Sequence, residues 1–193
     1  MGKFKPIIIM KRILLAICMM AMSALSYGQS NRVSFTFAWL SDVHLNSFAY
    51  AEDDLRQSIE DINANPAVDF TILSGDVTEF GDTKEFLLLQ EILEGFRKPY
   101  LLPGNHDVNW SENGCTMFNK IFQASHFCYD WQGVRFIGCG AGPSLRMGPP
   151  HIPREEILWL DSIVRATPKE LPVIFVNHFP LNRDLSNWYE VTD

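Results

Sequence analysis

Short apolar runs and longer mixed stretches take turns along the chain, and this pattern predicts strands that alternate with helices. The apolar runs contain β-branched and aromatic residues and predict strands at 33–40, 69–73, 99–102 and 173–176. Apolar residues at helical spacing predict helices at 51–63, 82–95, 115–123 and 153–164. Asp82 and Glu85 have the spacing of a capping box at the start of the second helix. This order of elements favours an α/β fold.

One part of the pattern departs from this alternation. Residues 127–131 and 134–139 are two strand-like runs joined by Gln132-Gly133, which predicts a β-hairpin. The fold is therefore not expected to alternate throughout. With 193 residues, 47% of them apolar, the chain is long enough for one globular domain with a substantial core.

Residues 1–28 have the organisation of a secretory signal peptide. A basic Lys-Arg pair precedes an apolar run at 13–22, and small residues follow around Gly28, where we expect cleavage. The run is too short to span a bilayer comfortably, so membrane contact is expected only through the cleaved signal. Residues 29–193 would then form the exported domain, either periplasmic or secreted. A lipoprotein anchor on Cys18 is disfavoured because a bulky residue precedes it.

The charge balance limits the classes of partner. The chain has a formal net charge of −7 at pH 7, and residues 1–28 contain four basic and no acidic residues. The remainder therefore carries −11, which argues against a protein that grips nucleic-acid phosphates with basic side chains. A small molecule is the expected partner instead.

Three cysteines remain after cleavage of the signal, namely Cys115, Cys128 and Cys139. In an oxidising compartment two of them can form a disulfide. Alternatively, all three can serve as small core residues. Their spacing matches no zinc-ribbon pattern, and the sequence leaves both readings open.

Residues with metal-binding or acid–base side chains follow four of the predicted strands. In chain order these are Asp42, His44, Asp76, Asn105, His106, Asp107 and His178. The carboxyl ends of parallel strands open into the crevice where α/β proteins bind ligands, so we expect these side chains to converge. Any one of them alone would be read as an ordinary turn or surface residue. The four clusters together favour a metal site.

The residue types suit a pair of divalent metal ions. Asp42 and His44 would hold the first ion through an oxygen and an imidazole nitrogen. Asp76 would bridge the two ions because a carboxylate offers two oxygens. Asn105 and His178 would complete the second site.

The chemistry predicted for such a site is the hydrolysis of a phosphate ester. Two metal ions lower the pKa of bound water toward neutrality, which gives a hydroxide that attacks phosphorus in line. His106 would stabilise the developing charge or protonate the leaving oxygen. Asp107 would orient His106.

The joint pattern resembles the calcineurin-like metallophosphoesterase family, and in particular its phosphodiesterase-like branch. The motifs that carry the resemblance are Asp42-x-His44, Gly75-Asp76 with Gly81, Gly104-Asn105-His106-Asp107, and the later His178. The resemblance covers residues 33–180 and implies an α/β sandwich of two mixed β-sheets flanked by helices. It also implies a dinuclear centre of manganese, iron or zinc and the hydrolysis of phosphomonoesters or phosphodiesters.

The resemblance has one departure. The family closes its site with a Gly-His-x-His element after a further strand, and this chain reaches Asp193 without it. We therefore expect the fold to be C-terminally incomplete. Two functions stay open: a metal-dependent phosphoesterase, or a catalytically incomplete metal-binding fragment of a longer exported phosphoesterase.

Glu79 stands where purple acid phosphatases have a tyrosine, so the purple acid phosphatase branch of the family is disfavoured.

Overall fold

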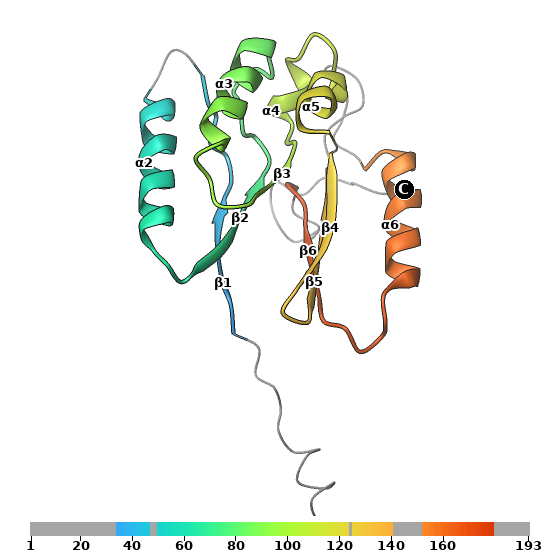
Figure 1. Ribbon diagram of the computed structural model, residues 1–193. Coiled ribbons are helices and arrows are strands. Elements are labelled where there is room, and N and C mark those ends of the chain that lie inside the picture. Colours follow the sequence, from blue (N-terminus) through green and yellow to red (C-terminus); the bar gives the residue numbers. More distant parts are fainter. Residues whose placement is uncertain (1–33, 47–49, 124, 141–151, 180–193) are drawn as a thin grey trace, which may run out of the picture. The chain divides into compact units, whose positions relative to one another are not determined.

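The computed structural model describes residues 34–46, 50–123, 125–140 and 152–179, and within them six strands form two sheets (Figure 1). The first sheet has three parallel strands in the order β1 (Thr36–Leu40), β2 (Val68–Ser74) and β3 (Pro99–Leu102). The second has the order β4 (His126–Trp131), β5 (Val134–Cys139) and β6 (Val173–Val176). In it, β4 and β5 are antiparallel and β5 and β6 are parallel. The predicted α/β fold is confirmed. Two mixed sheets were expected, but only the second sheet is mixed. The predicted signal peptide lies outside the described residues.

Five helices accompany the sheets in this part of the chain. They are α2 (Ala51–Ala64), α3 (Thr83–Leu93), α4 (His106–Asn109), α5 (Cys115–Phe122) and α6 (Arg154–Ala166). All of them were predicted except α4, which is a single short turn. Helices α2 and α3 lie beside the first sheet, whereas α6 lies beside the second (Figure 1). No helix among the described residues has both the length and the apolar character needed to cross a membrane.

Side-chain capping determines where α3 begins. Asp82 accepts hydrogen bonds from the amides of Lys84 and Glu85 at 2.8 and 2.9 Å. The Glu85 carboxylate accepts a hydrogen bond from the Phe80 amide at 2.9 Å, two residues before the partner that a capping box normally uses. These bonds satisfy amides that the first turn cannot pair, and they end the loop that follows β2.

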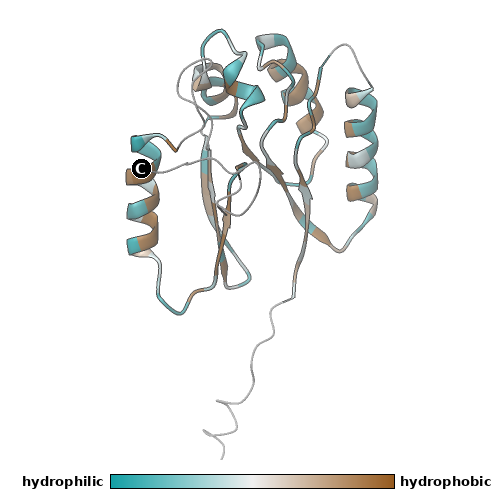
Figure 2. Cartoon of the chain, turned by 180° about the vertical axis from the view of Figure 1, so that it is seen from behind, coloured by the Kyte–Doolittle hydropathy of each residue, from teal (hydrophilic) through white to brown (hydrophobic). Residues whose placement is uncertain are grey.

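Aromatic side chains fill the space between the two sheets. Phe70 from β2 and Phe136 from β5 are both fully buried, with ring centroids 5.2 Å apart in an edge-to-face arrangement. Phe37 from β1 stacks on Phe70 at 5.3 Å. Figure 2 shows hydrophobic residues along the strands of both sheets. Because aromatic rings bury large areas, this layer accounts for much of the attachment between the sheets.

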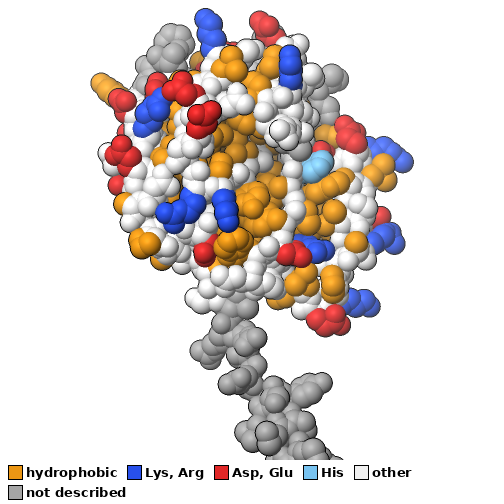
Figure 3. All heavy atoms as spheres, viewed as in Figure 1, with side chains coloured by type: hydrophobic (Ala, Val, Ile, Leu, Met, Phe, Trp, Pro, Cys, Tyr) orange, Lys and Arg blue, Asp and Glu red, His pale blue; other side chains and the backbone are white. Residues whose placement is uncertain are grey.

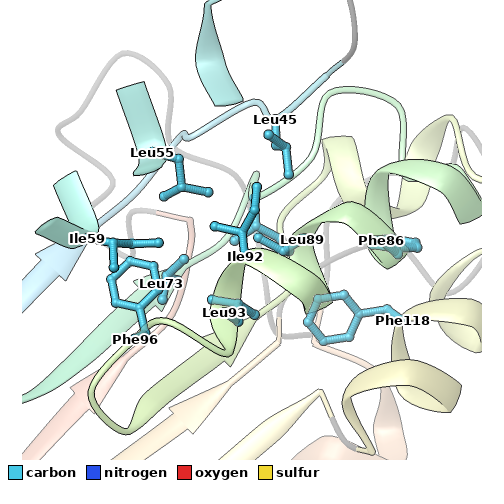
Figure 4. Packing of buried hydrophobic residues seen from close by; sticks show 11 residues of the cluster. Leu45, Leu55, Ile59, Leu73, Phe86, Leu89, Ile92, Leu93, Phe96 and Phe118 are labelled. Atoms are coloured by element: carbon cyan, nitrogen blue, oxygen red, sulfur yellow. The ribbon is translucent and has the colours of Figure 1, made fainter. Parts of the chain in front are cut away.

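A second apolar cluster lies between the first sheet and its helices (Figure 4). Its buried members include Leu55, Ile59, Leu73, Leu89 and Phe118. The helical members recur at helical spacing, so the apolar stripes of the sequence are buried faces. Leu45 and Val77, from the loops after β1 and β2, belong to the same cluster and are fully buried. The core therefore holds these two loops in place.

Helix α6 is attached to the second sheet by a buried acid. Glu156 accepts hydrogen bonds from Ser125 Oγ at 3.0 Å and from His126 Nδ1 at 2.9 Å. The His126 ring also stacks on Trp159, with centroids 4.0 Å apart. By contrast, Leu158 and Val164 of the same helix are 58% and 55% exposed. The attachment of α6 thus depends strongly on polar contacts.

An apolar groove of about 410 Å³ runs where the edge strands β3 and β4 approach each other. Its lining includes Leu93, Tyr100, Leu101, Phe122 and Phe127. Figure 3 shows hydrophobic side chains gathered over the middle of this face, with charged side chains around them. None of the predicted site residues lines this groove.

The three cysteines of the described residues are free thiols, so no disulfide links them. Cys139 is buried, Cys115 is half-buried and Cys128 is exposed. Burial raises the pKa of Cys139 to about 12 and that of Cys115 to about 11. The prediction of small core residues therefore suits Cys139 and is wrong for Cys128.

Candidate metal centre

The loops that follow β1 and β2 stay paired beyond the ends of their strands. The Asp42 amide donates to the Gly75 carbonyl at 3.1 Å, and the His44 amide donates to the Asp76 carbonyl at 2.9 Å. These bonds continue the parallel ladder for several residues. As a result, the side chains of Asp42 and His44 lie beside Asp76.

Three predicted ligands have left-handed backbone conformations. The φ angle is 56° at Asp42, 50° at His44 and 48° at Asp76. For residues other than glycine this conformation costs roughly 1–2 kcal/mol each. Such residues persist where the surrounding structure holds them, and they gather at functional sites. Here the paired loops and their buried apolar residues hold all three.

His44 faces the two carboxylates that were predicted to hold the first metal ion with it. His44 Nε2 lies 4.0 Å from Asp42 Oδ1 and 3.9 Å from Asp76 Oδ2. Ligand atoms that are each about 2.1 Å from a shared ion lie about 3 to 4 Å from one another. The two separations lie at the upper end of this range. The Asp42 and His44 side chains are 57% and 32% exposed, so a ligand can reach this side of the centre.

The predicted ligands of the second ion lie closer together. His178 Nε2 is 3.3 Å from Asp76 Oδ2 and 3.3 Å from Asn105 Oδ1. His178 Nδ1 is 3.0 Å from the Ser74 carbonyl, which can only accept, so Nδ1 carries a proton. In the neutral ring, Nε2 then directs a lone pair at two oxygens that also carry lone pairs. A proton on Nε2 would let His178 donate to these oxygens, and a metal ion between the three atoms would take the place of that proton.

The ionisation of Asp76 and His178 follows from their contact. Burial raises the pKa of the Asp76 carboxyl, but the hydrogen bond and charge of His178 and the His106 amide outweigh it, and the pKa lies below its usual value. Burial lowers the pKa of His178, whereas the contact with Asp76 raises it above its usual value. The pocket therefore favours positive charge next to Asp76.

Asp76 is shared by two groups of ligand-type atoms. One group contains Asp42, Asp76 and His178 and the other contains His44, Asp76 and His106, with the atoms of each group within 4.8 Å of one another. Asp76 is 4% exposed, and its Oδ1 accepts a hydrogen bond from the His106 amide at 2.8 Å. Oδ2 faces His44 and His178. This shared position is the one expected of a bridging carboxylate, although the two groups place Asp42 with His178 and His44 with His106, unlike the predicted ligand sets.

Two glycines of the sequence motifs permit these close approaches. A Cβ on Gly104 would overlap both Oδ1 and the backbone nitrogen of Asp76. A Cβ on Gly75, where φ is 103°, would lie 2.7 Å from His178 Cγ. A side chain at either position would push a predicted ligand away from the others.

His106 is held by a residue whose role the sequence did not reveal. Its Nδ1 lies 2.8 Å from the Glu79 carbonyl and therefore donates to it. The Glu79 carboxylate lies 2.9 Å from His44 Nδ1 and 3.6 Å from His106 Nδ1. The sequence signal was its position three residues after Asp76, inside the motif that Gly81 ends.

Asp107 is fully buried and connects the loops after β2 and β3. Its carboxylate accepts hydrogen bonds from the Thr78 amide at 2.8 Å, the Thr78 hydroxyl at 2.7 Å and the Gly104 amide at 2.8 Å. Burial raises its pKa to about 6, although these hydrogen bonds lower it. The orienting contact predicted from Asp107 to His106 is made by Glu79 instead. Asp107 acts on the site by holding its loops.

Comparisons with known proteins agree with this geometry. The family model described as calcineurin-like phosphoesterase matches residues 35–192. A curated relative, "Probable glycerophosphodiester phosphodiesterase GpdQ" of Arcobacter nitrofigilis, is 26% identical over 166 residues, which cover 74% of this chain and 56% of the relative. The chain thus spans about half the length of that relative. On the family match over most of its length, together with the four strand-end motifs, the chain belongs to the calcineurin-like phosphoesterase family.

Proposed function

We propose that this protein hydrolyses phosphate esters of small molecules with the help of two divalent metal ions. The observation that carries the proposal is that two groups of ligand-type atoms share the buried carboxylate of Asp76. Membership of a phosphoesterase family supports the reaction class. The name of the relative, a glycerophosphodiester phosphodiesterase, favours phosphodiesters over phosphomonoesters.

The donor set fits metal ions of the manganese, iron or zinc kind. Asp42, His44 and Asp76 would hold the first ion, and Asp76, Asn105 and His178 would hold the second. When bound, the ions supply an activated water and polarise the phosphoryl oxygens. Two carboxylates neutralise only half the charge of two divalent ions, so an anionic ester is attracted although the chain as a whole is acidic.

His106 is the residue that would transfer a proton. The Glu79 carbonyl holds its Nδ1–H at 2.8 Å, which leaves Nε2 as the atom that exchanges a proton with the substrate. Its side chain is 27% exposed, so a substrate can reach it. Asp107 supports this chemistry indirectly by fixing the loop on which His106 lies.

Hydrolysis of bis(4-nitrophenyl) phosphate and 4-nitrophenyl phosphate by the purified protein with added manganese tests the proposal. We expect turnover of the diester that EDTA abolishes. Asp76→Ala and His106→Ala should each lower the rate by about 100-fold or more. Asp61→Asn, an exposed substitution on α2, is the control and should keep the full rate. Metal-independent turnover, or full activity in both site variants, would refute the proposal.

A second candidate is that the chain binds metal ions without hydrolysing esters. It is favoured by the two groups of ligand-type atoms, which can hold ions whether or not an ester is hydrolysed. The same experiment separates the two candidates. A folded protein that binds manganese and turns over neither ester supports the second one.

We also propose that the protein is exported, on the basis of the signal-peptide pattern in residues 1–28. Fractionation of cells that express the whole chain tests this proposal. Cleaved protein outside the cytoplasm is expected. Intact chain that stays in the cytoplasm would contradict it.

A further inference from the structure

We propose that Glu79 is a positioning residue that orients both His44 and His106 and thereby strengthens binding of the first divalent ion. The inference rests on the proposed metal centre and assigns it a supporting residue. Glu79 contacts His44 with its carboxylate, and it contacts His106 with both its carboxylate and its carbonyl.

The contact with His44 determines which nitrogen is available to a metal. Glu79 Oε2 lies 2.9 Å from His44 Nδ1, although the angle is not that of a hydrogen bond. Among the described residues this buried nitrogen has no hydrogen-bond partner, and the Glu79 carboxylate lies beside it. An acceptor there favours the ring form with the proton on Nδ1. The lone pair of Nε2 is then directed at Asp42 and Asp76, as metal binding requires.

The contact with His106 fixes the second ring. The Glu79 carbonyl accepts the Nδ1–H of His106 at 2.8 Å, and Glu79 Oε1 lies 3.6 Å from the same nitrogen. The rings of His44 and His106 meet edge to face, with centroids 4.5 Å apart and an interplanar angle of 88°. One residue therefore sets the orientation of two neighbouring imidazoles.

The backbone of Glu79 is itself well held. Its amide donates to the Leu45 carbonyl at 3.1 Å, and Leu45 is fully buried. The preceding residue, Thr78, forms a bridge with Leu45 and donates to buried Asp107. A supporting residue can orient a ligand only if it is rigid, and these contacts provide that rigidity.

The position of Glu79 distinguishes it from a metal ligand. Its carboxylate lies against Nδ1 of His44, whereas Asp42 and Asp76 lie against Nε2 on the other side of the ring. Glu79 would therefore act on the ion through His44. Supporting partners of metal-bound histidines typically raise metal affinity by about 10- to 100-fold. We expect a contribution of the same order from Glu79.

Calorimetric titration of the purified chain with manganese chloride, in the absence of any ester, tests the inference. Glu79→Ala should bind the first ion about 10- to 100-fold more weakly than the wild type. Glu79→Gln keeps an acceptor oxygen and should recover part of this loss. Glu60→Ala removes an equal charge from the exposed face of α2 and should change the affinity by less than about twofold, because distant exposed charges are screened.

The outcomes separate the inference from the proposed function. If the wild type binds no manganese, the metal centre itself fails. If the wild type binds and Glu79→Ala binds equally well, only the role of Glu79 fails. Equal losses in Glu79→Ala and Glu60→Ala would replace positioning by a general charge effect and overturn the inference. If Glu79→Ala does not fold, Glu79→Leu, which also lacks the acceptor oxygen, decides, and wild-type affinity in that variant overturns the inference.

The visible absorption of bound cobalt provides a second readout that does not depend on activity. Loss of orientation at His44 should change the intensity and position of the cobalt bands in Glu79→Ala. Glu60→Ala should give the wild-type spectrum. A wild-type spectrum in Glu79→Ala would show that His44 keeps its orientation without Glu79, and the inference would fail.

Discussion

Adding one methyl group at Gly104 should disable the metal centre without unfolding the chain. The Cβ of an alanine would overlap Asp76 Oδ1 and the Asp76 backbone nitrogen. Asp76 has little freedom to yield, because its Oδ1 is hydrogen-bonded to the His106 amide and its carbonyl to the His44 amide. Gly104 does not have a left-handed φ, so the expected cost comes from the overlap alone.

The size of the effect follows from the overlap. One loop must shift by about 1 Å to restore an ordinary carbon–oxygen contact. Overpacking of this kind costs about 1–3 kcal/mol of stability, which a domain with about 5–15 kcal/mol survives. A displacement of about 1 Å at reacting groups, however, lowers rates by about 100-fold. Function should therefore fall much further than stability.

Gly133 provides a matched control for this substitution. It lies in the turn between β4 and β5 with a φ of 81°, and a Cβ there would meet no atom within 4 Å. Gly133→Ala should lose about 1–2 kcal/mol through backbone strain and leave manganese binding unchanged. Urea unfolding measures the stability of both variants, and calorimetric titration measures their affinity for manganese. Wild-type manganese affinity in a folded Gly104→Ala protein would refute the argument.

Three further predictions concern the rest of the molecule. Phe70→Ala should lower the free energy of urea unfolding by about 3–5 kcal/mol, because Phe70 is fully buried among other rings; a loss below about 1 kcal/mol would contradict this. Cys128 should react with Ellman's reagent before Cys139 in the folded protein, since Cys128 is exposed and Cys139 buried; mass mapping that finds Cys139 labelled first would contradict it. Burial raises the pKa of Glu85, so the folded state keeps this proton to higher pH than the unfolded state, and the stabilisation is lost as pH rises through the folded pKa. Glu85→Gln should therefore show a smaller fall in unfolding free energy from pH 4 to pH 7 than the wild type, and an equal fall would exclude this contribution.

Most of the fold could be predicted because the elements carry their own periodic signals. The apolar spacing in α2 and α3 marks faces that are buried against the first sheet. Helix α4 was not predicted, since four residues are too few to establish a period and Asn105 makes no side-chain capping bond there. Trp39 continues the alternation of β1 but is 53% exposed, and its Nε1 donates to Ser74 Oγ at 2.8 Å.

The candidate site was predictable in its members but not in their partners. Residue type and position after a strand identified Asp42, Asp76 and His178. The partners of Asp107 and Glu79 depend on how loops far apart in the sequence pair with each other, as the bond from Thr78 to Asp107 illustrates. No local spacing encodes that pairing. The contact of His106 with Glu79 in place of Asp107 could therefore be seen only in three dimensions.

The left-handed backbone at Asp42, His44 and Asp76 also limits how this centre can evolve. Apart from glycine, the residues that tolerate this conformation best are asparagine, aspartate and histidine. These three types also offer oxygen or nitrogen atoms to divalent ions. Substitutions that keep the fold at these positions thus tend to keep a metal-binding atom. A lineage can therefore exchange one ligand type for another and alter its metal preference. It does not need to pass through a sequence that fails to fold.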